Sequence, residues 1–253
     1  MTNTFYKAFA SERYKLSKNK EVFGVLFLPT LVVLGVFFYL IYKVPMEPIA
    51  LNPWYGFLGR YVFMFFYMLF PVLIAVFVHS CCDVEYKNNN YKLLFTLPIS
   101  HAKIYLAKAL FILIIVSFSV VGAYVFFLLS GYLLQFISPN YGFQNFDFRE
   151  IAFYTFFKLW IGCLAVSMIQ FALSLFFRSF IYPVGFSLFV TVFCSVISSK
   201  KFADFIPYSS SPKSFDNLMN QIASLERLDY INLIYNIFFL GLSYFIFIRK
   251  KNL

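Results

Sequence analysis

Six apolar stretches dominate this sequence, and each is close to the ~20 residues that an α-helix needs to cross the hydrocarbon core of a bilayer. Their approximate bounds are 22–42, 56–80, 107–130, 151–177, 181–198 and 230–248. Of the 253 residues, 61% are hydrophobic and only 13% are charged, so a water-soluble domain would have no interior large enough to bury them. The sequence therefore predicts an all-α integral membrane protein with six transmembrane helices in a single domain, residues 1–253.

The basic residues predict the orientation of this protein in the membrane. If all six stretches span, thirteen Lys and Arg residues fall on one side and eight on the other. Cytoplasmic loops carry the excess of basic residues, so both termini and the loop 83–106 are expected in the cytoplasm, with the segment 199–229 outside. The formal charge of +10 lies at the ends of apolar runs rather than on one soluble face, which argues against a nucleic-acid partner.

The N-terminal segment 1–21 has the pattern of an amphipathic helix. Phe5, Phe9 and Leu16 fall on one side, whereas Lys7, Lys15 and Lys18 fall on the other. Such a helix can lie in the membrane interface, with its rings among the lipid headgroups and its lysines near anionic lipid. Glu12 interrupts the apolar side. A solvated basic tail is the alternative interpretation.

Few residues of the spans carry chemistry. Lys158 is the only ionisable side chain well inside an apolar run, and no catalytic motif, metal-ligand set or nucleotide-binding glycine loop is present. The four cysteines form no CxxC pair, and we expect them to pack in the interior rather than to form disulfides. The polar residues at membrane depth either bond neighbouring helices together or line a substrate path; the candidates for that path are Ser117, Ser167, Gln170 and Ser174.

Two histidines leave open a different class of function. His79 and His101 lie near the expected cytoplasmic interface, together with Asp83. A polytopic membrane enzyme acting on lipid would use such groups. A scaffold without transport activity is a third hypothesis.

The segment from Asp83 to Lys108 is the longest polar interval that also carries positive charge. Asp83 is expected to cap a short amphipathic helix. Pro98 is expected to end that helix, because the residue before a proline is driven out of the α region. Ser100 is then expected to cap the third span. A short helix held between two spans is suited to contact with another protein.

This segment resembles the ABC-2 class of transporter permeases, in which an acidic residue begins a cytoplasmic coupling helix and a Leu-Pro-Ile-Ser corner follows. The matching residues are Glu85, then 97–100, with Lys103 and Lys108 opening the third span. The N-terminal sequence SERYKLSKNK, before a first span that contains Pro29, resembles the permeases that protect bacteria against lantibiotics and bacitracin.

The resemblance implies a half-transporter of the bacterial cell membrane that exports an amphipathic peptide or a lipid-like substrate. Its implied partners are separate ABC ATP-binding subunits, which bind ATP and Mg²⁺, and a second permease copy or a sister permease. The chain itself would bind no cofactor. The residues implied in ATPase coupling are Glu85, Tyr86, Lys87, Tyr91, Leu94, Phe95, Leu97, Pro98, Ile99, Ser100 and Lys103.

Overall fold

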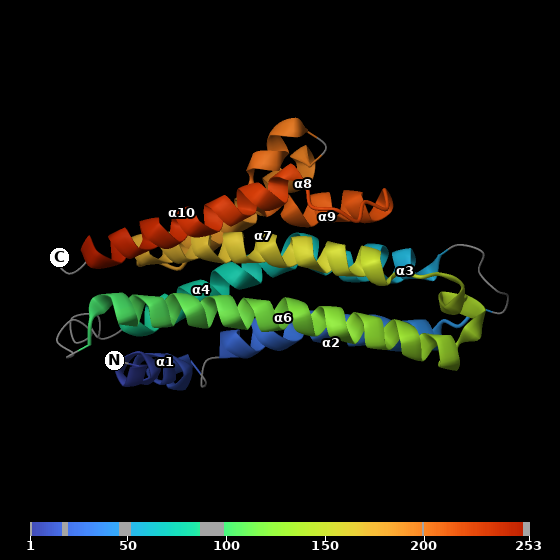
Figure 1. The fold of residues 1–253 in the computed structure, drawn as a ribbon, viewed down its shortest axis with the longest axis horizontal. Coiled ribbons are helices and arrows are strands. Elements are labelled where there is room, and N and C mark those ends of the chain that lie inside the picture. The colour runs from blue at the N-terminus through green and yellow to red at the C-terminus, as the bar shows by residue number, and fades with distance from the viewer. Residues whose placement is uncertain (1, 17–19, 46–51, 87–98, 199, 250–253) are drawn as a thin grey trace.

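The computed structural model describes residues 2–16, 20–45, 52–86, 99–198 and 200–249, and this part of the chain forms helices without any β-strand. The long helices run side by side in an elongated bundle (Figure 1). Five helical stretches are long and apolar enough to cross a membrane, and a sixth apolar helix is shorter: Val22–Tyr42, Phe65–Glu85, His101–Ile137, Arg149–Phe176, Arg227–Arg249 and the shorter Ile181–Ile197. The prediction of an all-α membrane protein is thereby confirmed.

The α-helices are α1 (Thr2–Leu16), α2 (Lys20–Tyr42), α3 (Pro53–Tyr55), α4 (Phe70–Tyr86), α6 (His101–Ile137), α7 (Arg149–Phe176), α8 (Ile181–Ile197), α9 (Ser210–Met219) and α10 (Arg227–Arg249). Between them lie two π-helical segments, η1 (Gly56–Val62) and η2 (Phe65–Leu69), and four 3₁₀ segments, η4 (Pro139–Tyr141), η5 (Phe143–Asn145), η6 (Lys201–Phe205) and η7 (Pro207–Ser209).

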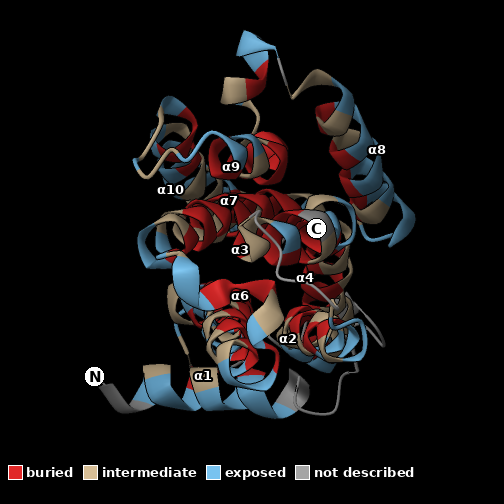
Figure 2. Ribbon diagram, turned by 90° about the vertical axis from the view of Figure 1, so that its right-hand side faces the viewer, coloured by how far each residue is buried: buried red, intermediate tan, exposed pale blue. Residues whose placement is uncertain are grey.

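Helix α7 is the centre of the bundle. It contacts α4, α6, α9 and α10, and Figure 2 shows buried residues along most of its length. Small residues permit this close packing: at Gly162, the position of an added Cβ would lie 2.3 Å from the Cβ of Ser210. Helix α8 lies at the edge of the bundle in the same view.

Both chain termini lie at one end of the bundle (Figure 1). We call this the terminal end, and it also contains the last turn of α4 and the first turn of α6. Figures 1 and 2 together show α1 lying across the direction of the long helices at this end. Helix α6 has 37 residues and spans about 55 Å at 1.5 Å per residue, whereas the hydrocarbon core is ~30 Å thick. It therefore extends well beyond the predicted span 107–130.

The second span departs from regular α-helix before its proline. In η2 the backbone N–H of Phe70 bonds to the carbonyl of Phe65, five residues back, and Pro71 follows with no N–H to donate. The carbonyl of Pro71 accepts a bond of 3.0 Å from Ser187 of α8. The irregular turns and this contact fix α8 against the second span.

The opposite end of the bundle, which we call the far end, is closed by an aromatic cluster around Trp54. Its indole donates to the carbonyl of Phe143 over 3.1 Å, and its ring stacks on Phe148. Gly142 begins η5 with φ at 74°, a conformation that glycine adopts without strain. The Tyr141 hydroxyl donates to the carbonyls of Leu40 and Lys43 at the end of α2. This contact supplies a partner to carbonyls that the C-terminus of a helix leaves unpaired.

Gly131 gives a direct test of this packing. An added Cβ would lie 2.1 Å from Cζ3 of Trp54, and Trp54 is buried, so Gly131→Ala should destabilise the protein by about 1–3 kcal/mol. The matched control is Gly35→Ala in α2, where no atom lies within 4 Å of an added Cβ. This variant should leave the free energy of unfolding unchanged or raise it by up to about 1 kcal/mol, because alanine has the higher helix propensity. Thermal unfolding in detergent measures both. Equal melting temperatures for the two variants would contradict the packing described.

Candidate functional site

A buried lysine joins three helices at the terminal end. Lys108 of α6 lies 2.6 Å from the Glu85 carboxylate of α4 and 3.5 Å from the Glu12 carboxylate of α1. Its ammonium also donates to the carbonyl of Cys81 over 2.7 Å. All three charged residues are at most 3% exposed. A charge removed from water must be paired to be tolerated, so the ammonium requires α1 and α4 to stay against α6. We call these three residues the Lys108 junction.

Further contacts hold α1 along the start of α6. The ring of Phe9 packs against Phe111 with centroids 6.3 Å apart. Lys103 donates to the Thr4 hydroxyl over 2.7 Å. The opposite face of α1 is exposed and includes Tyr6 and Tyr14. Helix α1 is therefore amphipathic, with an apolar side that packs on the protein itself.

The structure corrects three expectations for this region. Asp83 does not cap a new helix, because α4 continues without a break to Tyr86. Glu85 therefore lies in the last turn of α4, where its carboxylate meets Lys108. Lys108, expected to open the third span, instead lies in the second turn of α6, which begins at His101, and is buried. The sequence signal that could have indicated a buried ion pair here is Glu12. It is an acid on the apolar side of an amphipathic helix, where a charge requires a buried partner.

The other predicted coupling residues are only partly described. Lys87, Tyr91, Leu94, Phe95, Leu97 and Pro98 lie outside the described residues, and so does the side chain of Tyr86. Ile99 packs against the hydrophobic core. Ser100 occupies the N-cap of α6 as expected, but its side chain makes no capping bond. The described coupling residues thus lie beside the Lys108 junction, at both ends of the segment 87–98.

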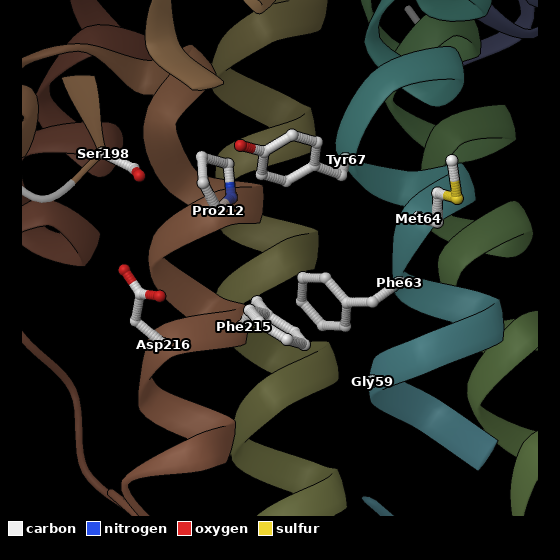
Figure 3. Close-up of a pocket in the computed structure, with 8 residues that line it drawn as sticks. All are labelled: Gly59, Phe63, Met64, Tyr67, Ser198, Pro212, Phe215 and Asp216. Carbon is white, nitrogen blue, oxygen red and sulfur yellow. The ribbon is translucent and has the colours of Figure 1, made fainter. Parts of the chain in front are cut away.

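A cleft of about 310 Å³ lies between the second span and α9. Phe63 and Tyr67 project into it from the second span and Phe215 projects from α9, whereas Asp216 of α9 lies at its edge (Figure 3). The rings of Phe63 and Phe215 lie 5.5 Å apart. Gly59 allows this approach, because an added Cβ would lie 3.1 Å from Phe215 and 2.8 Å from the terminal carbon of Met219. We call this space the α9 cleft; sequence reasoning did not predict it.

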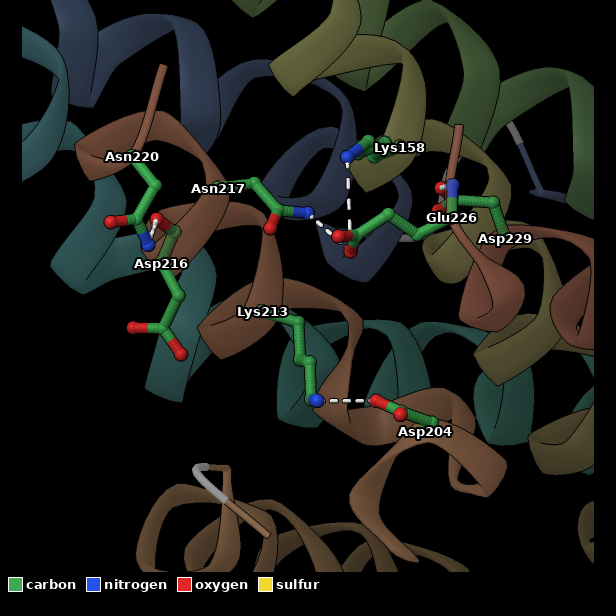
Figure 4. Close-up of polar contacts among 8 residues, drawn as sticks. All are labelled: Lys158, Asp204, Lys213, Asp216, Asn217, Asn220, Glu226 and Asp229. Atoms are coloured by element: carbon green, nitrogen blue, oxygen red, sulfur yellow. Dashed lines mark hydrogen bonds and ion pairs between the residues drawn. The ribbon is translucent and has the colours of Figure 1, made fainter. Parts of the chain in front are cut away.

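A second buried lysine anchors the segment that carries α9. Lys158 of α7 is 2% exposed and lies 4.0 Å from the carboxylate of Glu226. Asn217 donates to the same carboxylate over 2.7 Å, and the backbone N–H of Glu226 donates to Asp229 over 2.8 Å (Figure 4). The carboxylate of Glu226 thus bonds to α9 and faces a lysine of α7. That lysine, Lys158, is the cation that the apolar pattern had marked as unusual.

A family profile described as "ABC-2 family transporter protein" matches residues 8–194. The chain belongs to this family. It is a membrane-spanning permease subunit of an ABC transporter. The match covers the second half of α1, the Lys108 junction and most of the central bundle. It confirms the ABC-2 resemblance, whereas the resemblance to the lantibiotic and bacitracin group stays a prediction. No significant match was found among curated proteins or among solved structures.

Three of the four predicted path residues, Ser167, Gln170 and Ser174, share one buried face of α7. Ser117 of α6 accepts a bond of 2.9 Å from the Trp160 indole, and Ser167 donates to a carbonyl of its own helix. Gln170 donates to the Tyr208 hydroxyl of η7. Ser167, Gln170 and Ser174 are fully buried in α7. In this conformation the three α7 residues face the packed interior, and Ser117 takes part in a contact between α6 and α7.

Two residues of the enzyme hypothesis, His79 and Asp83, lie one turn apart on α4. His79 is buried and packs edge-on against Phe180, with centroids 5.6 Å apart, whereas His101 begins α6. Among the described residues, no three His, Cys, Asp or Glu side chains lie together as a metal-binding group would require. The four cysteines are buried, and none of them forms a disulfide. Because the chain belongs to a transporter family, we assign no catalytic role to these histidines.

Lys108→Met tests the junction. It leaves two buried carboxylates without their cation, and breaking a buried pair in this way costs about 3–5 kcal/mol, so the melting temperature in detergent should fall clearly. The triple variant Glu12→Gln, Glu85→Gln, Lys108→Met removes all three charges and should recover most of the loss. Lys103→Met, which removes only an exposed contact with Thr4, is the control. A Lys108→Met protein as stable as the control would show that the ion pairs do not hold the helices together.

Proposed function

We propose that this permease is the membrane half of an ATP-driven exporter and that segment 83–100 docks on a separate ATP-binding subunit. That subunit would bind ATP and Mg²⁺ and would carry out hydrolysis. The observation that carries the proposal is the Lys108 junction, which lies directly beside the two ends of this segment. Glu85 lies near the start of the segment, in the last turn of α4, and Lys108 follows the segment in the second turn of α6.

This arrangement can convert motion of a docked partner into motion of the spans. A displacement of the segment acts on α4 and α6 together, because a buried ion pair of 2.6 Å joins them. Helices are rigid along their length, and packed interfaces shift as units rather than deform continuously. Helix α1 follows through Glu12. Nucleotide-driven closure of the ATPases would thus rock three helices at once.

The assembly we propose has the terminal end in the cytoplasm of a bacterial cell. The basic residues of the loops favour this orientation, and the exposed tyrosines of α1 then lie at the lipid interface, where such side chains are enriched. Two permease copies, or this chain and a sister permease, would flank a common path for an amphipathic peptide or a lipid-like substrate. The surrounding lipid would cover the exposed apolar faces of the spans.

Recovery of the partner tests the docking proposal. Purification of the tagged permease from its native membranes in mild detergent should recover an ATP-binding subunit, identified by mass spectrometry. A variant with Tyr91→Asp, Pro98→Ala and Ile99→Ala should lose at least nine-tenths of it, because a carboxylate replaces an apolar anchor and the corner is removed. The control is Tyr42→Asp, which introduces the same charge at a residue 86% exposed at the far end.

Equal recovery with the loop variant and the control would exclude the segment as the docking element. Recovery of the permease without any ATP-binding subunit would exclude the exporter assembly as a whole.

A further inference from the structure

Asp216 presents a carboxylate at the edge of the α9 cleft, where Lys213 of the same helix acts on it electrostatically without forming an ion pair. The side chain is exposed, and its carboxylate makes no hydrogen bond or ion pair with the described residues; only its backbone carbonyl accepts a bond, from Asn220. The nearest cation along α9 is Lys213, whose ammonium forms an ion pair with Asp204 (Figure 4). Asp216 therefore has an open position for a cation.

The groups opposite Asp216 are aromatic rings. Phe63, Tyr67 and Phe215 line the same cleft as Asp216, and Figure 3 shows the carboxylate at the edge of the cleft, on the side away from the rings. The hydroxyl of Tyr67 donates to the carbonyl of Ser195 over 3.1 Å, so this ring is held in place. The faces of aromatic rings attract cations, and an ammonium bound among them gains further when a carboxylate is close.

The backbone of the second span also points to a binding role. Gly59 belongs to η1 and Tyr67 to η2, and both are π-helical. Single π-helical turns within α-helices occur often at functional sites. Here they turn Gly59, Phe63 and Tyr67 toward α9, which leaves a space of about 310 Å³. Small-molecule sites begin at about this size.

We propose that the α9 cleft binds the ammonium group of an amphipathic cation, with Asp216 as the counter-charge and Phe63, Tyr67 and Phe215 as the aromatic wall. A neutral molecule of the same shape would gain only the apolar contact, and an anion would be repelled by Asp216. The ammonium can belong to a free amphiphile or to the headgroup of an aminophospholipid, because the two share this chemistry. Binding at this cleft needs neither ATP nor the ATP-binding subunit, so it is independent of the coupling proposal.

The test uses the purified permease in nanodiscs made of phosphatidylglycerol only, with benzyltrimethylammonium as the probe and calorimetry as the readout. The wild type should bind the probe, whereas neopentylbenzene, its neutral isostere, should bind at least tenfold more weakly. Asp216→Asn should weaken probe binding at least tenfold, and Asp216→Glu should retain most of it. The matched control is Glu150→Gln, which removes the same charge from an exposed residue in the first turn of α7 and should leave binding unchanged.

A second arm identifies the natural source of the ammonium. If an aminophospholipid headgroup occupies the cleft, nanodiscs with half phosphatidylethanolamine should lower the apparent probe affinity of the wild type severalfold. If affinity is the same in both membranes, the site serves a free amphiphile. The proposal is overturned if the wild type does not bind the probe, if it binds the neutral isostere equally well, or if Asp216→Asn and Glu150→Gln bind like the wild type.

Discussion

One ammonium group determines how the terminal end of this permease is built. Lys108 lies in a helix long enough to cross the membrane, yet its side chain is almost fully buried. A cation there is tolerated only when paired and hydrogen-bonded, and Glu12, Glu85 and the Cys81 carbonyl provide those contacts. Each partner comes from outside α6, so the requirement of one side chain fixes the position of α1 and of the end of α4. The segment proposed to dock on the ATPase lies between the elements joined in this way.

The far half of the molecule uses the same physical device on α7. Lys158 is buried within a span and faces Glu226, with Asn217 bonded to the same carboxylate. This pairing holds α9 over the bundle, and the position of α9 in turn forms the cleft that contains Asp216. In both places a lysine of a span is matched by an acid from another segment of the chain. The charges thus specify which helices lie together, whereas apolar packing alone would allow many arrangements.

Apolar patterning predicted the class of this fold because the length and hydropathy of a span are local properties of the sequence. The ABC-2 resemblance was likewise readable from the residues around Glu85 and Pro98. Pairings across the chain were not predictable in the same way: Glu12 and Lys108 are far apart in sequence, and nothing local shows that they meet. Lys158 was recognised as unusual, but its partner Glu226 follows only from the path of the 199–229 segment. The α9 cleft depends on π-helical turns near Pro71, which have no simple sequence signal.

The central claim is that the Lys108 junction makes α1 and α6 one rigid unit during the transport cycle. A distance measurement by pulsed electron spin resonance tests it, with spin labels at Ser11 on the exposed side of α1 and at Leu129 on the exposed side of α6. In the assembled transporter, the distribution of distances between the two labels should be narrow and should be the same with and without ATP. In Lys108→Met this distribution should broaden. A distance that shifts with ATP in the wild type, or a Lys108→Met distribution as narrow as the wild type, would contradict the account.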